Sequence, residues 1–148
     1  MRNSIIKIVA ILLLLFNGIG AVYGGGNLIL HPDGSSLGIT VEWLKYSPFT
    51  NFLIPGIILF LVNGVFSFVV IIFILMKWPY YKTMILTVGL MLCGWILIQM
   101  IFLRTVNNLH IIMGTTGVLL MTIGLLLMEK RRRCKFSYFR QTFPSVHS

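Results

Sequence analysis

Long apolar stretches separated by short polar ones dominate the chain, and the clearest of them covers residues 52–76. These 25 residues include no charged side chain and lie between Pro48 and Lys77. As an α-helix they would be about 37 Å long, enough to cross a hydrocarbon core of about 30 Å with some tilt. A domain of this size cannot cover a helix that is apolar on every side. The pattern therefore predicts a transmembrane helix.

Three further stretches have the same character, and the pattern predicts helices over residues 6–26, 83–103 and 110–128. Residues 77–82 and 104–109 form short turns, which join antiparallel neighbours, whereas residues 27–51 form the one long loop. The predicted fold is an all-α membrane protein, with four transmembrane helices in an up-down left-handed bundle over residues 1–128. Residues 129–148 are predicted to form a basic, aromatic cytoplasmic tail.

The first apolar stretch allows two interpretations. A basic start at Arg2 and Lys7, an apolar run, and small residues near Gly24 are typical of a signal peptide that is removed. However, the apolar character continues to Leu30, and a chain with both ends on one side of the membrane needs an even number of spans. We favour a retained first helix, and cleavage near Gly24 stays the alternative.

Positive charge is concentrated at the ends of the predicted helices. The net charge is +9, yet 57% of the residues are hydrophobic and only 10% are charged, so the charge is not spread over a soluble face. With both termini cytoplasmic, ten Lys and Arg residues lie inside and two, Lys45 and Arg104, lie outside, as the positive-inside rule requires. We therefore predict a multi-pass protein of the cytoplasmic membrane with no nucleic-acid partner.

The end of the chain combines positive charge with aromatic residues. Next to a membrane, such a segment attracts anionic lipid headgroups, with about 1 kcal/mol per charge near the surface. The predicted lipid-surface contacts are Lys130, Arg131, Arg132, Arg133 and Lys135. The lipid bilayer is thus the predicted partner, and a protein partner or a second copy of the chain stays open.

Small and polar residues recur within each predicted helix at alternating spacings of three and four. Lipid tails are as apolar as leucine, so helices in a membrane must be held by close approach and interhelical hydrogen bonds. That spacing is the seam of a left-handed bundle. The predicted helix-packing glycines are Gly20, Gly24, Gly94, Gly114, Gly117 and Gly124.

Deep within the predicted helices lie the polar side chains of Asn17, Asn63, Ser67 and Gln99. An unpaired amide in hydrocarbon is costly. Since Asn17 and Asn63 stand at similar depth in helices of opposite direction, we predict that they point inward and bond to a neighbouring helix or to each other. Gln99 lies opposite the predicted seam of its helix and marks a second contact, either with a bundle helix or with a partner chain.

Candidate chemistry is sparse, because Asp, Glu, Lys and Arg are absent from the centres of the predicted helices. No HExxH, GxSxG or phosphate-loop motif occurs. Cys93 and Cys134 lie at different predicted depths, which disfavours a disulfide between them. We predict no cofactor and no metal, and we favour a protein without enzymatic activity.

The remaining polar side chains gather at the outer end of the predicted bundle, and they form a candidate outer pocket: His31, Asp33, Glu42, Arg104 and His110. One interpretation is that salt bridges and hydrogen bonds among them hold the outer loop in place, and we favour it. The alternative is a small polar pocket for a headgroup or another ligand. The spacing of the histidines and the carboxylates is not diagnostic of a metal site.

Three runs, FNGIGAVYGG, HPDGSSLG and SPFTNFLIPGIILFLVNG, resemble a group of small four-helix bacterial membrane proteins. The resemblance covers roughly residues 16–100, is most specific over residues 32–38 and the following SPF and LIPG, and leaves out the tail. It implies a four-helix membrane fold, and it brings no activity, cofactor or catalytic residue with it.

These observations leave three functional hypotheses. The favoured one is a structural or interaction protein of the bacterial cytoplasmic membrane. The first alternative is a small carrier or binding protein for a lipid or neutral solute, with an outward-facing pocket. The second alternative is a small membrane enzyme whose few polar groups converge only in three dimensions.

Overall fold

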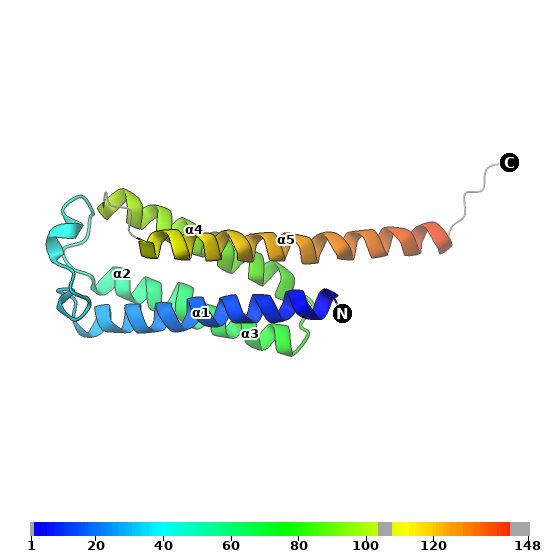
Figure 1. Ribbon diagram of the computed structural model, residues 1–148, viewed down its shortest axis with the longest axis horizontal. Helices are drawn as coiled ribbons and strands as arrows, with labels where there is room; N and C mark the ends of the chain where they lie inside the picture. The colour runs from blue at the N-terminus through cyan, green and yellow to red at the C-terminus, as the bar shows by residue number, and fades with distance from the viewer. Residues whose placement is uncertain (1, 104–107, 143–148) are drawn as a thin grey trace.

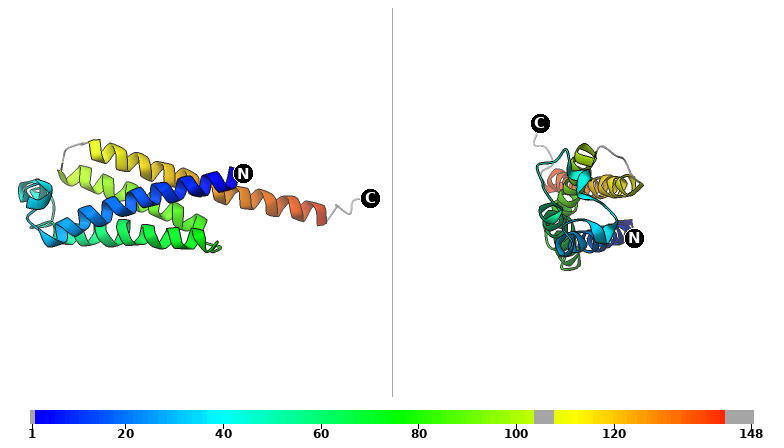
Figure 2. Two further views of the ribbon diagram at one scale, coloured as in Figure 1. Left: turned by 60° about the horizontal axis from the view of Figure 1, so that its bottom comes forward. Right: turned by 90° about the vertical axis from the view of Figure 1, so that its left-hand side faces the viewer.

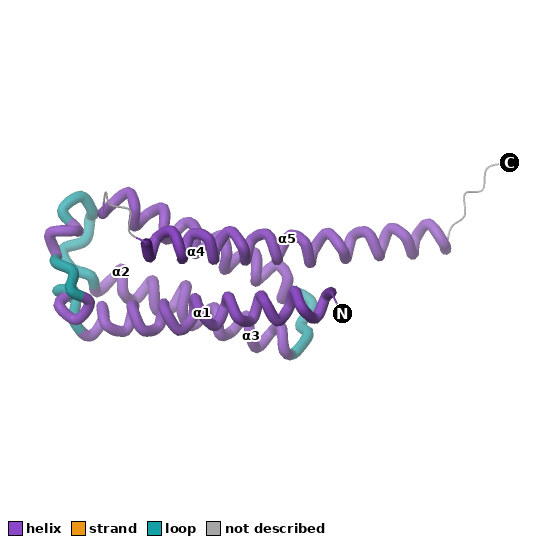
Figure 3. Tube along the Cα trace, in the orientation of Figure 1, coloured by secondary structure: helices purple, strands orange, loops and turns teal. Residues whose placement is uncertain are grey.

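The structure, a computed structural model, describes residues 2–103 and 108–142. Helices make up most of this part of the chain (Figures 1 and 3). In chain order they are α1 (Arg2–Leu30), η1 (Ser35–Leu37), η2 (Val41–Leu44), α2 (Leu53–Ile58), η3 (Leu59–Val65), α3 (Phe66–Leu75), α4 (Tyr81–Leu103) and α5 (Asn108–Thr142).

Four helical segments are long and apolar enough to cross a membrane: Ser4–Leu30, Leu53–Leu75, Tyr81–Phe102 and Asn108–Glu129. The prediction of an all-helical chain with four such segments is therefore confirmed. The handedness of the bundle and the side of the membrane on which the termini lie stay predictions.

The second span is one continuous helix with a π-helical middle, η3, between α2 and α3. In an α-helix, a row of residues at every fourth position drifts around the axis by about 40° per step. A π turn holds more residues than an α turn, so it turns such a row back. Consequently Gly56, Phe60 and Gly64 all stay in contact with α1.

The four spans form two antiparallel pairs, α1 with α2–α3 and α4 with α5, which we call the α1–α3 hairpin and the α4–α5 hairpin (Figures 1 and 2). Glycines bring the two backbones of each hairpin into contact. A Cβ on Gly25 would lie 2.7 Å from the main-chain nitrogen of Phe60, and one on Gly89 would lie 2.7 Å from that of Met121. Only glycine permits helices to approach so closely.

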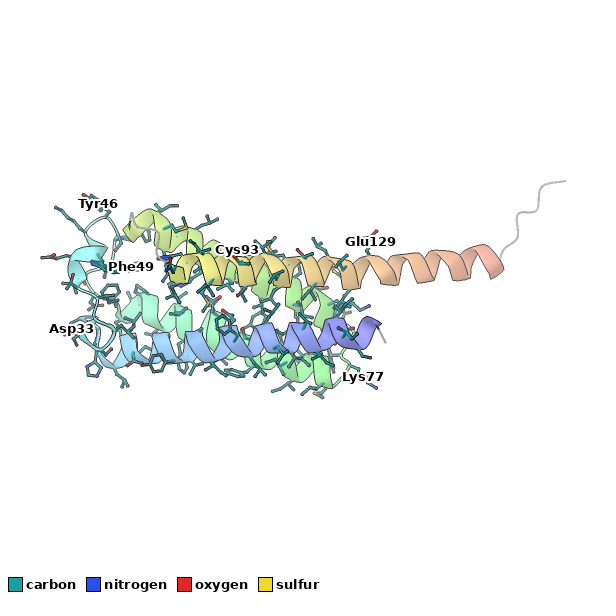
Figure 4. All side chains as sticks on the ribbon, in the orientation of Figure 1. Asp33, Tyr46, Phe49, Lys77, Cys93 and Glu129 are labelled. Atoms are coloured by element: carbon teal, nitrogen blue, oxygen red, sulfur yellow. The ribbon has the colours of Figure 1, made fainter. Side chains whose placement is uncertain are left out.

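Two predicted glycines of α5 make such contacts. A Cβ on Gly117 would lie 2.6 Å from Cys93 Sγ, and one on Gly124 would lie 2.8 Å from the main-chain nitrogen of Leu86. Cys93 belongs to α4 and lies at mid-depth beside α5 (Figure 4). The seam of the α4–α5 hairpin therefore follows the predicted row of α5.

For α4 the predicted packing glycine is wrong. Nothing lies within 4 Å of a Cβ built on Gly94, and Leu97 and Ile101 on the same face are exposed. The close contact with α5 runs through Gly89 instead. Because α4 is apolar on every side, its sequence does not distinguish a small residue that faces lipid from one that faces a helix.

The two hairpins meet through larger side chains. These buried residues come from α1, α3, α4 and α5, and we call them the inner core: Ala10, Leu14, Val70, Ile71, Ile74, Tyr81, Ile85, Val88, Leu120, Ile123 and Leu127. The hairpins lie closest in the half of the bundle that contains the N-terminus, and they diverge toward the loop that carries η1 and η2 (Figures 1 and 2).

Helix ends differ from the predicted ones where polarity or glycine was the only signal. α1 continues through residues 24–26 to Leu30, because these glycines pack on the second span, so the long loop begins at His31. α5 continues past Glu129 to Thr142 and projects beyond the other helices (Figure 1). Polar residues end a membrane span, but they do not end the helix here, because residues 129–142 include neither Gly nor Pro.

The turn between α3 and α4 has a specific hydrogen-bond pattern. Lys77 has φ 55°, its N–H donates to the carbonyl of Ile74, and the N–H of Trp78 donates to the carbonyl of Phe73. The Phe73 and Trp78 rings lie 5.8 Å apart. This is the Schellman motif with its hydrophobic contact, and it reverses the chain within a few residues.

The contact at Gly89 yields a direct test of the α4–α5 hairpin. Gly89→Ala would place a methyl group against the α5 backbone, so we expect an overpacking loss of about 1–3 kcal/mol and a lower melting temperature in detergent. Gly94→Ala is the matched control in the same helix and should leave the melting temperature unchanged. Equal effects of the two substitutions would contradict this packing.

Candidate functional site

The loop between α1 and α2 holds three of the five residues of the candidate outer pocket, and all three are exposed. His31 follows α1, Asp33 lies in the next turn, and Glu42 lies in η2. Figure 4 places Asp33 at this end of the bundle, with Tyr46 and Phe49. These three side chains therefore do not line a closed cavity.

Asp33 organises its own turn. Its Oδ1 accepts hydrogen bonds from the Ser35 hydroxyl at 2.8 Å and from the Ser35 main-chain N–H at 3.3 Å. The hydroxyl bond and then the main-chain bond hold the pKa of Asp33 below its usual value, and the neighbouring His31 contributes in the same direction. A carboxyl pKa that is lower in the folded state stabilises the turn above the unfolded pKa, and this is lost as the pH falls through the folded pKa.

The structure does not bring the candidate outer pocket together as a metal centre. His110 is buried in the first turn of α5, whereas Arg104 lies outside the described residues. Within residues 2–103 and 108–142, no three His, Cys, Asp or Glu side chains lie close enough to hold a metal ion.

Apolar contacts also hold the loop in place. Leu28, Leu44 and Phe52 form a small buried cluster between the end of α1, η2 and the start of α2. The Phe49 ring packs edge-on against the Phe102 ring of α4, with 6.4 Å between centroids. The loop thus bridges the two hairpins at the end of the bundle where they diverge.

A set of buried, hydrogen-bonded polar residues lies deeper in the bundle, and the Asn17 side chain donates two of its hydrogen bonds. Asn17 Nδ2 lies 2.9 Å from Ser67 Oγ and 3.2 Å from the main-chain oxygen of Asn63, and it donates to both. The Ser67 hydroxyl in turn donates to the Asn63 oxygen at 2.6 Å. All three residues are buried. We call Asn17, Asn63 and Ser67 the amide cluster, and it joins α1 to the second span.

The amide of Asn63 does not take part in these bonds. Its side chain is 0% exposed, and neither Nδ2 nor Oδ1 has a hydrogen-bond partner among the residues that the structure describes. Asn17 and Asn63 therefore point inward and bond to each other as predicted, but through the main-chain oxygen of Asn63 and not through its side-chain amide. This oxygen lies in the π-helical segment and accepts hydrogen bonds from Asn17 Nδ2 and from the Ser67 hydroxyl.

A second buried donor on α4 is also unpaired, the indole Nε1 of Trp95. Trp95 was not among the candidate site residues, since one aromatic residue in an apolar helix gives no signal by itself. Gln99 is half-buried one turn further along α4, and whether its contact is with a bundle helix or with a partner chain stays a prediction.

The remaining predicted residues have varied surroundings. A Cβ on Gly20 would lie 3.6 Å from Met113, one on Gly24 would lie 3.6 Å from Leu59, and one on Gly114 would lie 3.9 Å from Ile96. These are ordinary contacts, with room for a methyl group. Residues 130–135, predicted to touch lipid, belong to the projecting part of α5.

No protein-family model, curated protein or solved structure matches this chain. A function must therefore be argued from the chemistry and placement of the described residues.

The two asparagines of the amide cluster should respond oppositely to leucine. Asn17→Leu removes two interhelical hydrogen bonds, so we expect a loss of about 0.6–2 kcal/mol and a lower melting temperature in detergent. Asn63→Leu keeps the main-chain oxygen and removes an unpaired buried amide, so the melting temperature should stay equal or rise. Destabilisation by Asn63→Leu as large as that by Asn17→Leu would contradict this arrangement.

Proposed function

We propose that this chain is a structural or interaction protein of the bacterial cytoplasmic membrane, which holds anionic lipid headgroups at its basic inner end. The observation that supports this most strongly is the placement of positive charge at one end of the bundle. The start of α1, the α3–α4 turn and the part of α5 after Glu129 share that end (Figures 1 and 4).

Contacts at this end also support the proposal. Lys7 Nζ lies 5.1 Å and Lys82 Nζ 5.9 Å from the centroid of the Tyr81 ring. Two ammonium groups from α1 and α4 therefore converge on one ring at the inner face, and cation–π attraction holds them there. A concentration of positive charge beside a membrane favours anionic phospholipid.

The continuous α5 adds to this charge. Residues 130–135 follow the fourth span without a helix break, so their basic residues lie within about 10 Å of the last span residue, Glu129, along the axis. That is the depth of the headgroup region. We infer that Lys130, Arg131, Arg132, Arg133 and Lys135 contact lipid phosphates.

Lipid retention tests the proposal. The full chain is purified in nanodiscs that contain phosphatidylglycerol and phosphatidylethanolamine, and tightly bound lipid is quantified by native mass spectrometry. Replacing Lys130, Arg131, Arg132 and Arg133 with glutamine should reduce the bound phosphatidylglycerol by more than tenfold, since each of the four charges contributes about 1 kcal/mol and about 1.4 kcal/mol corresponds to tenfold. High salt should reduce it in wild type.

Lys45→Gln, on the predicted outer loop, is the control and should not change this lipid ratio. Unchanged phosphatidylglycerol in the fourfold variant would contradict the proposal. A reporter fused after Ser148 that is active only outside the cytoplasm, or a mature chain that begins near Gly24, would contradict the orientation.

One observation favours a second candidate function, a small binding protein or carrier for a neutral or lipid-like molecule. It is the unpaired, fully buried amide of Asn63. A polar group that is left unpaired in a membrane span requires an explanation, and ligand contact is a common one.

A further inference from the structure

The amide of Asn63 is the least well explained polar group in the described part of the chain. Asn17, at a comparable depth, has two partners for its amide nitrogen, and Asn63 has none for either side-chain atom. Packing alone does not account for this residue, because an apolar side chain of the same shape would avoid the cost of burying an amide. A molecule that forms hydrogen bonds with the Asn63 amide would remove this cost.

The residue also lies in an unusual helical segment. Asn63 belongs to η3, the π-helical middle of the second span. Single π turns within α-helices are frequently found at functional sites, because they change the direction of a few side chains at a cost in stability. The π turn and the unpaired amide therefore occur at the same position.

Trp95 supplies a second unpaired donor at the same level. Asn63 is ten residues from Leu53 and Trp95 is eight residues from Leu103, which are the outer ends of α2 and α4. At 1.5 Å per residue, the two residues lie about 15 Å and about 12 Å below the outer end of the bundle. α4 and η3 are in contact.

Trp95 lies on a different side of α4 from the residue that packs on α5. Gly89 marks the side of α4 that packs on α5. Trp95 follows six residues later, which corresponds to about 120° around the helix from Gly89. The indole therefore lies on a different side of α4 from the α5 contact at Gly89, and its Nε1 is buried. Trp95 and Asn63 thus belong to α4 and η3, two segments from different hairpins that are in contact.

The chemistry of these groups defines what they can bind. Asn63 Nδ2 and Trp95 Nε1 are N–H donors, and one carbonyl oxygen has two lone pairs that can accept from both. No Asp, Glu, Lys or Arg occurs within residues 52–76 or 83–103, so nothing in these spans would compensate a charged ligand. The depth lies within the hydrocarbon region, which selects a ligand that is soluble in the membrane.

We propose that the seam between η3 and α4 binds a neutral, membrane-soluble molecule through a carbonyl oxygen, which accepts hydrogen bonds from Asn63 Nδ2 and Trp95 Nε1. The proposal deepens the second candidate function and rests on it. It does not depend on the orientation of the chain or on the basic inner end.

Access to this level requires the hairpins to separate locally, since the Asn63 side chain is fully enclosed. The hairpins are suited to such a motion at this depth. Within each hairpin, glycines hold the backbones together, whereas the contact between hairpins is made by side chains and is concentrated in the inner core. Parting the hairpins near Asn63 leaves the inner core and both glycine seams intact.

The test uses the full chain in nanodiscs and a decyl-substituted benzoquinone with ¹³C-labelled carbonyls as the probe. Infrared difference spectra should show a labelled quinone carbonyl band at lower frequency than in nanodiscs that contain the quinone but no protein. Hydrogen bonding of the carbonyl to N–H groups lowers this frequency. Loss of one hydrogen bond should weaken quinone binding about three- to tenfold, so we expect this weakening in both Asn63→Leu and Trp95→Phe, together with a smaller band shift.

Asn27→Leu is the matched control, because the Asn27 amide donates to the Tyr23 carbonyl of its own helix, and it should bind like wild type. Asn63→Leu without quinone must melt no lower than wild type, which separates lost binding from lost folding. Wild-type binding by Asn63→Leu would overturn the proposal, and so would the absence of any shifted carbonyl band at saturating quinone. Loss of lipid retention at the basic end would leave this result unaffected.

Discussion

The structure depends on one constraint, that helices surrounded by lipid gain nothing from hiding apolar surface against each other. Association must then come from close backbone approach and from hydrogen bonds that hydrocarbon cannot offer. Gly25 and Gly56 provide that approach between α1 and the second span, and Gly89 and Gly117 provide it between α4 and α5. The molecule is accordingly built from two tight hairpins rather than from four equivalent helices.

The bundle is layered along its axis, and the layers differ in chemistry. Aliphatic side chains of the inner core join the two hairpins in the half near the N-terminus, the amide cluster joins α1 to the second span at mid-depth, and an apolar loop cluster covers the opposite end. The π-helical segment lies at mid-depth in the second span. It keeps every fourth residue of that span in contact with α1, and the Asn63 side chain within it is fully buried. A solid inner half and a polar middle give the bundle a rigid base below the candidate ligand site.

The sequence was sufficient to predict which segments are the four apolar spans. It was not sufficient to predict which side of each helix faces another helix and which faces lipid. The predicted helix over residues 52–76 corresponds to an observed span of Leu53–Leu75, because length and uniform hydrophobicity suffice to define it. Asn17 was correctly expected to bond across helices, since an amide in hydrocarbon needs a partner. Gly94 was misplaced and Trp95 missed, because a uniformly apolar helix carries no signal for which side faces lipid. The amide of Asn63 could not be foreseen, as its direction depends on the π turn.

The central claim is that glycine contacts hold each hairpin together as a separate unit, and single-molecule force spectroscopy tests it most directly. The chain is pulled out of a bilayer from its C-terminus while force and extension are recorded. If glycine contacts make each hairpin one cooperative unit, the first major event should release the chain back to the α3–α4 turn, and a second should release α1 with the second span. A stepwise release of single helices at equal force, or extraction of the whole bundle in one event, would contradict the account.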